Sequence, residues 1–141
     1  GGGGLTVALD ARGAPGVEVL DRAVRAAASL VFALARDESC ELVLPGRSGA
    51  IAVGPALSGW AGALAALAVV EASAGDAGSP AVTTGAPLIW VSASGAGPAA
   101  GTRGYLVSAR PAPGRRVVFS VAGCHGQALD PATVAPHGVA A

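Results

Sequence analysis

Residues 5–10 read Leu-Thr-Val-Ala-Leu-Asp, and Ala-Arg-Gly and a long amphipathic segment at 17–36 follow them. The continuous apolar run at 5–9 predicts a parallel strand that is covered on both faces. Apolar side chains at positions 20, 24, 27, 31 and 34 recur at helical spacing, which predicts a helix over 17–36. A strand that ends in a carboxylate and leads into a helix is typical of an open α/β sheet, which binds ligands where its strands end.

The rest of the chain extends this pattern. Further strands are expected at 40–44, 50–53, 88–91, 105–109 and 115–121, and a second helix at 57–72. The predicted fold class is α/β: an open, mostly parallel, Rossmann-like sheet with helices on both faces and the first strand near its centre. The predicted domain spans 5–123, with a flexible lead-in at 1–4 and a C-terminal surface tail at 124–141.

Composition narrows the classes of function. Hydrophobic residues make up 52% of the chain and charged residues 13%, which excludes an intrinsically disordered chain. Nine arginines balance nine acidic residues, and this neutrality argues against a nucleic-acid or anionic-membrane partner. The compact apolar part of the uncharged segment, 57–70, is shorter than the ~20 residues that a bilayer requires, so a buried or partner-covered helix is expected there. Trp60 and Trp90 are expected to be core residues.

The cysteines and histidines form no recognisable reactive motif. Cys40 and Cys124 show no metal-ligand spacing, and buried free thiols are favoured over a disulfide. Cys124 and His125 are neighbours in sequence, but catalytic pairs meet in space instead, so we expect no nucleophile here. His125 and His137 lack further ligands at a recognisable spacing.

Polar side chains follow the first strand and the strand at 88–91. Asp10 and Arg12 end the former, and Ser92 and Ser94 end the latter. In the predicted sheet these ends flank one crevice. Asp10 is either a ligand or a partner of Arg12, and the second reading is favoured because strand-end carboxylates commonly bond nearby groups. Neither serine lies in a Gly-x-Ser-x-Gly nucleophile elbow.

Four segments carry a family resemblance: Val-Ala-Leu-Asp-Ala-Arg at 7–12, the helix phrase at 20–30, Leu-Ala-Ala-Leu-Ala-Val-Val-Glu at 64–71, and the strand at 115–123. The chain resembles a von Willebrand factor A-type domain, and more narrowly the C-terminal portion of the bacterial family called domain of unknown function 58. The resemblance covers most of 5–123, and the helix phrase is its most specific part.

The resemblance also implies where a metal site would lie. Such domains hold a divalent cation with Asp-x-Ser-x-Ser after the first strand, then a Thr and a later Asp. Asp10 matches the first position, but Arg12 and Ala14 replace the two serines. Hard cations need several oxygen ligands, so we expect no metal and no other cofactor. The interaction crevice implied by this comparison comprises Asp10, Arg12, Ser58 in the place of the Thr, Ser92 and Ser94.

The function expected from the resemblance is a non-enzymatic protein-interaction or assembly module that works with a MoxR-type AAA+ ATPase. Family members carry N-terminal membrane helices, which implies a soluble domain at the cytoplasmic face of a membrane-anchored bacterial protein. The alternative is a small-molecule-binding or enzymatic domain that uses the crevice at the strand ends. A cofactor-binding Rossmann-like domain is a third, more distant reading.

Overall fold

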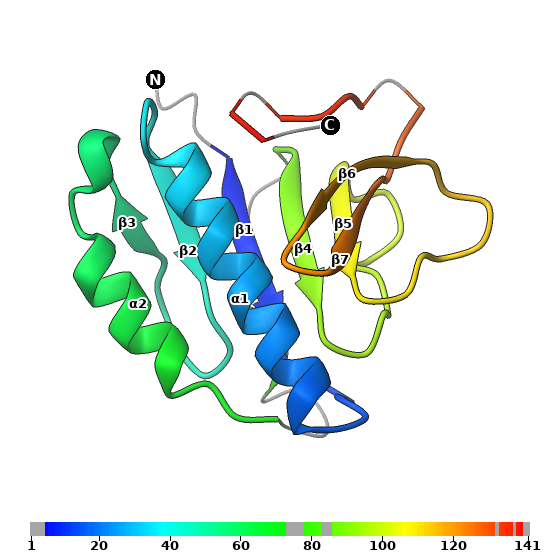
Figure 1. The fold of residues 1–141 in the computed structure, drawn as a ribbon, viewed down its shortest axis with the longest axis horizontal. Coiled ribbons are helices and arrows are strands. Elements are labelled where there is room, and N and C mark those ends of the chain that lie inside the picture. The colour runs from blue at the N-terminus through cyan, green and yellow to red at the C-terminus, as the bar shows by residue number, and fades with distance from the viewer. Residues whose placement is uncertain (1–4, 73–77, 83–85, 132, 137, 140–141) are drawn as a thin grey trace.

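The protein is an α/β domain with a seven-stranded mixed sheet and two α-helices (Figure 1). The computed structural model describes residues 5–72, 78–82, 86–131, 133–136 and 138–139. The expected lead-in at 1–4 lies outside these residues. The elements are β1 (Thr6–Asp10), α1 (Val17–Leu34), β2 (Cys40–Val43), β3 (Ile51–Val53), a 3-10 turn (Pro55–Leu57), α2 (Trp60–Ala68), β4 (Leu88–Ser92), β5 (Gly104–Ser108), β6 (Val117–Val121) and β7 (Cys124–Ala128).

The centre of the sheet is parallel and its two edges are antiparallel. The strand order is β3-β2-β1-β4-β5-β7-β6. β1 lies between β2 and β4, with Val7 opposite Leu42 on one side and Ile89 on the other. The predicted position of the first strand near the centre of the sheet is confirmed. β3 returns antiparallel to β2 and forms the edge of the sheet.

Helix α1 forms the core with one face of the sheet. Its buried residues are Leu20, Ala23, Ala26, Ala27, Leu30 and Val31. They pack against alternate strand residues such as Val7 and Leu9, which belong to the same cluster. Val31 is fully buried, whereas Val24 is only partly buried at the margin of this cluster.

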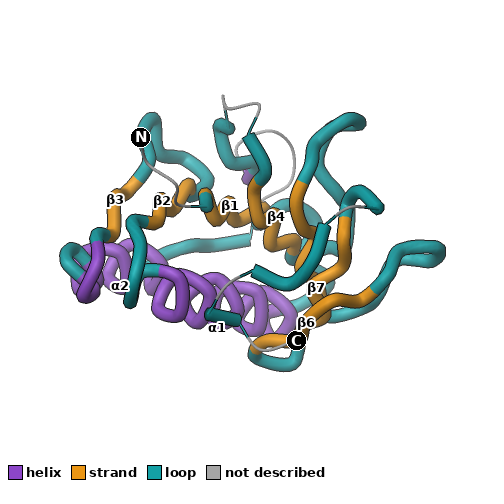
Figure 2. The backbone as a smooth tube through the Cα atoms, turned by 90° about the horizontal axis from the view of Figure 1, so that it is seen from above, coloured by secondary structure: helices purple, strands orange, loops and turns teal. Residues whose placement is uncertain are grey.

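Both helices lie on one face of the sheet, so the prediction of helices on both faces is wrong (Figure 2). The connections after β4 and β5 are rich in Gly and Pro, which disfavour a covering helix. A smaller cluster occupies the other face: Ala8, Val43, Leu88, Trp90 and Leu106. Loops cover it, and buried Gln127 holds one of them by accepting from the Ala112 N–H (2.7 Å) and donating to the Ala112 and Arg115 carbonyls (2.9 and 3.0 Å).

The sheet also contains a strand that the sequence pattern assigns to the tail. Residues Cys124–Ala128 form β7, which is hydrogen-bonded between β5 and β6. This segment has no β-branched or aromatic residue, so neighbouring strands determine its conformation. At Gly126 a Cβ atom would lie 2.3 Å from the Phe119 ring, so only glycine fits beneath that ring. Farther along the chain, the Tyr105 hydroxyl donates to the Val134 carbonyl and ties the C-terminal segment to β5.

Helix α2 begins at Trp60, later than the pattern predicts. Gly59 precedes it with φ of 85°, and no side chain caps the helix start with a hydrogen bond. A Cβ at Gly59 would lie 2.7 Å from the Ala52 carbonyl oxygen, so any larger residue would clash with the backbone of β3. Among the described residues, no helix is long and apolar enough to cross a membrane.

Only part of α2 is buried. Leu67 is 1% exposed, whereas Leu64 is 47% exposed, and Val69, which follows the last residue of the helix, is 76% exposed. Trp60 packs edge-to-face on Phe32 of α1, with ring centroids 5.5 Å apart. The helix therefore presents an uncharged, apolar outer face.

Leu67→Ala tests the packing of α2. Truncating a buried leucine typically costs about 2–5 kcal/mol, because the lost contacts leave a cavity. Leu64→Ala is the matched control on the same helix, and its half-exposed side chain predicts a loss below about 1 kcal/mol. Urea unfolding of both variants measures the difference, and equal losses would show that α2 does not pack as described.

Candidate functional site

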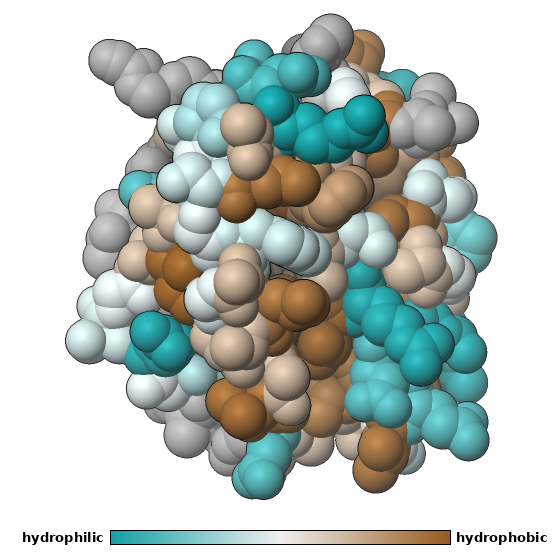
Figure 3. All heavy atoms as spheres, turned by 60° about the vertical axis from the view of Figure 1, so that its left-hand side comes forward, coloured by the Kyte–Doolittle hydropathy of each residue, from teal (hydrophilic) through white to brown (hydrophobic). Residues whose placement is uncertain are grey.

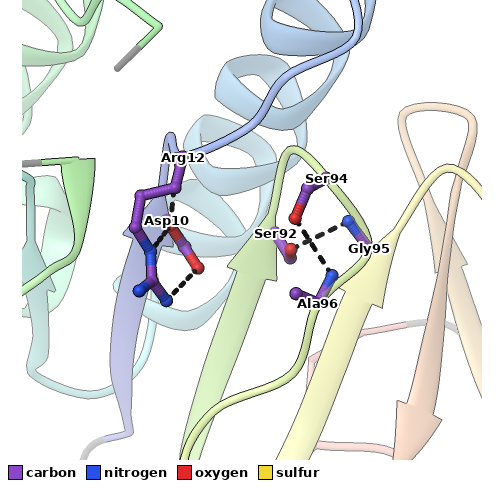
Figure 4. Close-up of polar contacts among 6 residues, drawn as sticks. All are labelled: Asp10, Arg12, Ser92, Ser94, Gly95 and Ala96. Carbon is purple, nitrogen blue, oxygen red and sulfur yellow. Dashed lines mark hydrogen bonds and ion pairs between the residues drawn. The ribbon is translucent and has the colours of Figure 1, made fainter. Parts of the chain in front are cut away.

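The carboxyl ends of β1 and β4 lie side by side. Asp10 is paired with Ser92 in the sheet, and the Ala93 N–H donates to the Asp10 carbonyl at 2.9 Å. Arg12 follows on the β1 side and Ser94 on the β4 side (Figure 4). Four residues that the sequence groups into one crevice are therefore brought together.

Asp10 is held by Arg12 in a bidentate ion pair. Arg12 Nε donates to Asp10 Oδ1 and Nη2 donates to Oδ2, both at 2.9 Å, and the Arg12 backbone N–H adds a bond to Oδ1 at 3.0 Å. The carboxylate is 1% exposed and the arginine side chain 36%. The prediction that Asp10 pairs with Arg12 is confirmed. Because both carboxylate oxygens already accept charge-assisted bonds, a cation would have to compete with a fixed guanidinium.

The two serines bind their own loop. Ser92 Oγ accepts the Gly95 N–H at 3.0 Å, and Ser94 Oγ accepts the Ala96 N–H at 3.1 Å. Local bonds of this kind shape the turn that follows a strand. Figure 4 shows both running into the loop after β4, away from Asp10.

Ser58 lies at the other end of the sheet. β3 runs antiparallel to β2, so Val53 is opposite Cys40, where the parallel strands begin. Ser58 lies beyond that pair, where its carbonyl accepts the Gly54 N–H at 2.8 Å. Asp10 ends β1 at the opposite edge. Ser58 therefore does not belong to the crevice. Sequence spacing does not indicate this position, because β3 runs antiparallel to β2 and carries the chain back to the other end of the sheet.

Neither cysteine belongs to a reactive site. Both are free and buried, as predicted. Burial raises the pKa of Cys40 to about 12, and the nearby charge of Glu41 makes a smaller contribution in the same direction. Burial also raises the pKa of Cys124, although the positive charge of Arg22 lowers it in part. Both thiols therefore stay protonated near neutral pH. Cys124 packs in the helix-side core, and its strand neighbour His125 points to the opposite face, which separates this pair.

Side chains that could bind a metal ion do not cluster in the part of the chain that the structure describes. Within these residues, no group of three or more His, Cys, Asp or Glu side chains is placed to hold an ion. His137 lies outside them. The crevice therefore presents one neutralised carboxylate and two hydroxyls that are engaged in turns.

Comparisons with protein-family models, with curated proteins and with solved structures return no match for this chain.

Removal of Arg12 tests the ion pair. Arg12→Met leaves a buried carboxylate without its guanidinium, and we expect a loss of about 1–3 kcal/mol, below the 3–5 kcal/mol of fully buried pairs because Arg12 is partly solvated. Adding Asp10→Asn to this variant should recover part of the loss, since the uncompensated charge is removed. Arg47→Met changes an exposed arginine and serves as the control.

A double-mutant cycle on Arg12→Met, Asp10→Asn and the double variant, measured by urea unfolding, gives the coupling energy between Asp10 and Arg12. Strictly additive losses would contradict the pair as a stabilising contact.

Proposed function

We propose that this chain is a non-enzymatic protein-interaction or assembly module with an A-type fold, and that its partner is a MoxR-type AAA+ ATPase. The strand order around β1, with an antiparallel β3 at the edge, is compatible with the fold that the resemblance implies. The same proposal places the domain at the cytoplasmic face of a membrane-anchored bacterial protein.

The observation that carries this proposal is the outer face of α2. No charged residue occurs from 48 to 70, yet Leu64 and Val69 are substantially exposed. Half-exposed Phe32 of α1 adjoins Trp60 and extends the apolar surface. Figure 3 shows apolar and small side chains gathered over this side of the molecule. Contiguous exposed apolar surface marks interaction sites on soluble domains.

A shallow groove beside α2 adds polar anchors to this surface. Leu44, Pro45 and Val69 line it, with Arg47 and Glu71 also contributing. Protein interfaces commonly combine an apolar centre with a polar rim. The groove lies near the carboxyl end of β2, so one partner could contact both α2 and the strand-end edge.

Charge placed at the C-terminal end of α2 should disrupt partner binding. Val69→Arg introduces a solvated cation into the proposed contact, and we expect affinity for the purified ATPase to fall by about tenfold or more. Val134→Arg is the matched control, because Val134 is 68% exposed on the C-terminal segment. Biolayer interferometry measures both, and the absence of any binding by the unaltered domain would reject this partner.

The crevice should bind no divalent cation. Mg²⁺ prefers octahedral oxygen coordination, and Ca²⁺ takes more ligands still. The Asp10 carboxylate already accepts two hydrogen bonds from the Arg12 guanidinium. Calorimetry with millimolar Mg²⁺, Mn²⁺ and Ca²⁺ is expected to show no saturable heat.

An Arg12→Ser, Ala14→Ser double variant supplies the two missing hydroxyls and frees Asp10, so it should gain Mn²⁺ affinity. An Mn²⁺ ion bound to Asp10 in crystals of the unaltered protein would contradict this prediction and would favour a metal-dependent adhesion domain.

A further inference from the structure

Strand β6 forms the edge of the sheet farthest from β3 (Figure 2). Among the described residues it pairs with β7 alone, so its outer edge carries backbone groups that have no neighbouring strand. Val117 is 44% exposed, and Ser120 is also exposed. The strand reads Val-Val-Phe-Ser-Val and lacks the proline and charged residues that commonly protect an edge from further pairing. This edge can therefore accept another strand.

The turn between β6 and β7 determines which backbone groups face outward. Ala122 and Gly123 have φ of 48° and 77°, the positive values of a two-residue type I′ turn. Val121 and Cys124 flank this turn and form its closing hydrogen-bonded pair. Because hydrogen-bonded and non-hydrogen-bonded pairs alternate in an antiparallel ladder, Ser120 belongs to a non-hydrogen-bonded pair. Its N–H and C=O therefore point to the outer edge of the sheet.

A bulge at the start of β6 limits what can pair with it. Val117 is opposite Gln127 and Phe119 is opposite Gly126, so Val118 is an extra residue in the strand. Bulges twist an edge and shorten the stretch that remains regular. Two bulged edges from two copies of the chain would pair over only a few residues. A short, flexible segment of another protein fits this edge better.

The part of the chain that forms this edge is basic. Residues 77–141 contain four arginines and one acidic residue, although the whole chain is neutral. Two of these arginines, Arg115 and Arg116, are exposed and come directly before β6. A strand added beside β6 lies about 5 Å from it, within reach of arginine side chains at its start. The charge of this edge therefore favours an acidic segment.

Backbone carbonyls, which carry no net charge, hold the two guanidinium groups. Arg116 Nη2 donates to the Thr133 carbonyl at 2.8 Å, and Arg115 Nη1 donates to the Leu129 carbonyl at 3.4 Å. Among the described residues, no carboxylate forms an ion pair with either arginine. A guanidinium has five N–H donors, so further donors remain for a carboxylate. Charge-assisted bonds of this kind are stronger than those to a neutral carbonyl.

A hollow of about 300 Å³ lies between the two arginines and the segment that follows β7. Of its described lining residues, Asp130 alone is acidic. The Thr133 hydroxyl donates to Asp130 Oδ2 at 2.6 Å, so this carboxylate already accepts a local hydrogen bond. Two guanidinium groups beside one carboxylate leave the described lining with a net positive charge, which favours the acidic side chains of a partner.

We propose that an extended acidic segment of a protein partner adds as a strand to the outer edge of β6, antiparallel to it, with its Asp or Glu residues beside Arg115 and Arg116. Antiparallel pairing continues the β6–β7 arrangement and is slightly more stable per residue than parallel pairing. Because β6 begins next to the two arginines, an antiparallel segment has its C-terminal end there. Main-chain hydrogen bonds supply the affinity, and the charges set the orientation. This surface is independent of the outer face of α2.

Two capped peptides of identical composition test the orientation. Thr-Val-Thr-Val-Thr-Glu-Glu has its acidic residues at the C-terminal end, and Glu-Glu-Thr-Val-Thr-Val-Thr has them at the N-terminal end. In ¹⁵N–¹H correlation spectra of the full chain, the first peptide should move the Ser120 amide signal downfield and saturably. We expect the second peptide to bind at least about fivefold more weakly, because its charges lie away from the arginines.

Arg115→Gln combined with Arg116→Gln removes both positive charges and should weaken binding of the first peptide by about fivefold or more. Arg36→Gln combined with Arg47→Gln is the matched control. Both of these arginines are exposed and flank β2, toward the other edge of the sheet. The control variant should bind the peptide as the unaltered chain does.

Methylation of the peptide backbone tests strand addition without any change to the protein, so this result does not depend on whether a variant folds. Only every second residue of an added strand bonds to β6. N-methylation of one alternate set of peptide residues should therefore abolish binding, and methylation of the other set should be tolerated.

The proposal is overturned if the Ser120 signal does not respond, if the two peptide orders bind alike, if both methylated sets bind equally, or if the control variant loses as much affinity. Equal binding of a thymidine heptanucleotide would indicate a general polyanion site and would also overturn it. A Ser120 shift that grows with protein concentration in the absence of peptide would assign the edge to a second copy of the chain instead.

Discussion

The close packing of α1 on the sheet is the constraint on which the rest of the structure depends. Ala23, Ala26 and Ala27 are fully buried, and such small side chains let the helix axis approach the strands. The helix contacts β1, β2, β4, β5, β6 and β7, as well as α2. One helix therefore organises strands from both halves of the chain, and its position determines how the chain leaves β1.

The crevice follows from this departure. The chain must turn sharply between Asp10 and the start of α1, and Gly13 takes φ of 62° within that turn. Arg12 consequently lies within reach of Asp10, two residues earlier in sequence. The ion pair is a local consequence of the β1–α1 connection, and the serine turns are local to the loop after β4. Only their position beside Asp10 requires β4 to pair in register with β1.

The local pattern of apolar residues predicts most of the helices and strands. It fails where neighbouring strands or a reversal of the chain direction determine the structure. The apolar run of β1 and the helical periodicity of α1 indicate these elements without further information. β7 has no such signal, because its conformation depends on β5, β6 and the space beneath Phe119. The crevice could be predicted in part: adjacency of Asp10 and Ser92 follows from parallel pairing, while Ser58 was misplaced because β3 reverses the chain.

The path of the C-terminal segment has a practical consequence for any surface to which the domain is attached. Leu5 accepts a bond from the Glu41 N–H just before β1, and Gly138 lies near the Ala33 carbonyl in the last turn of α1. Both described ends of the chain are therefore at the edge where the parallel strands begin. Immobilisation through either end would orient the Asp10 edge outward, so a sensor chip or a display scaffold would present that edge to an analyte without a redesigned linker.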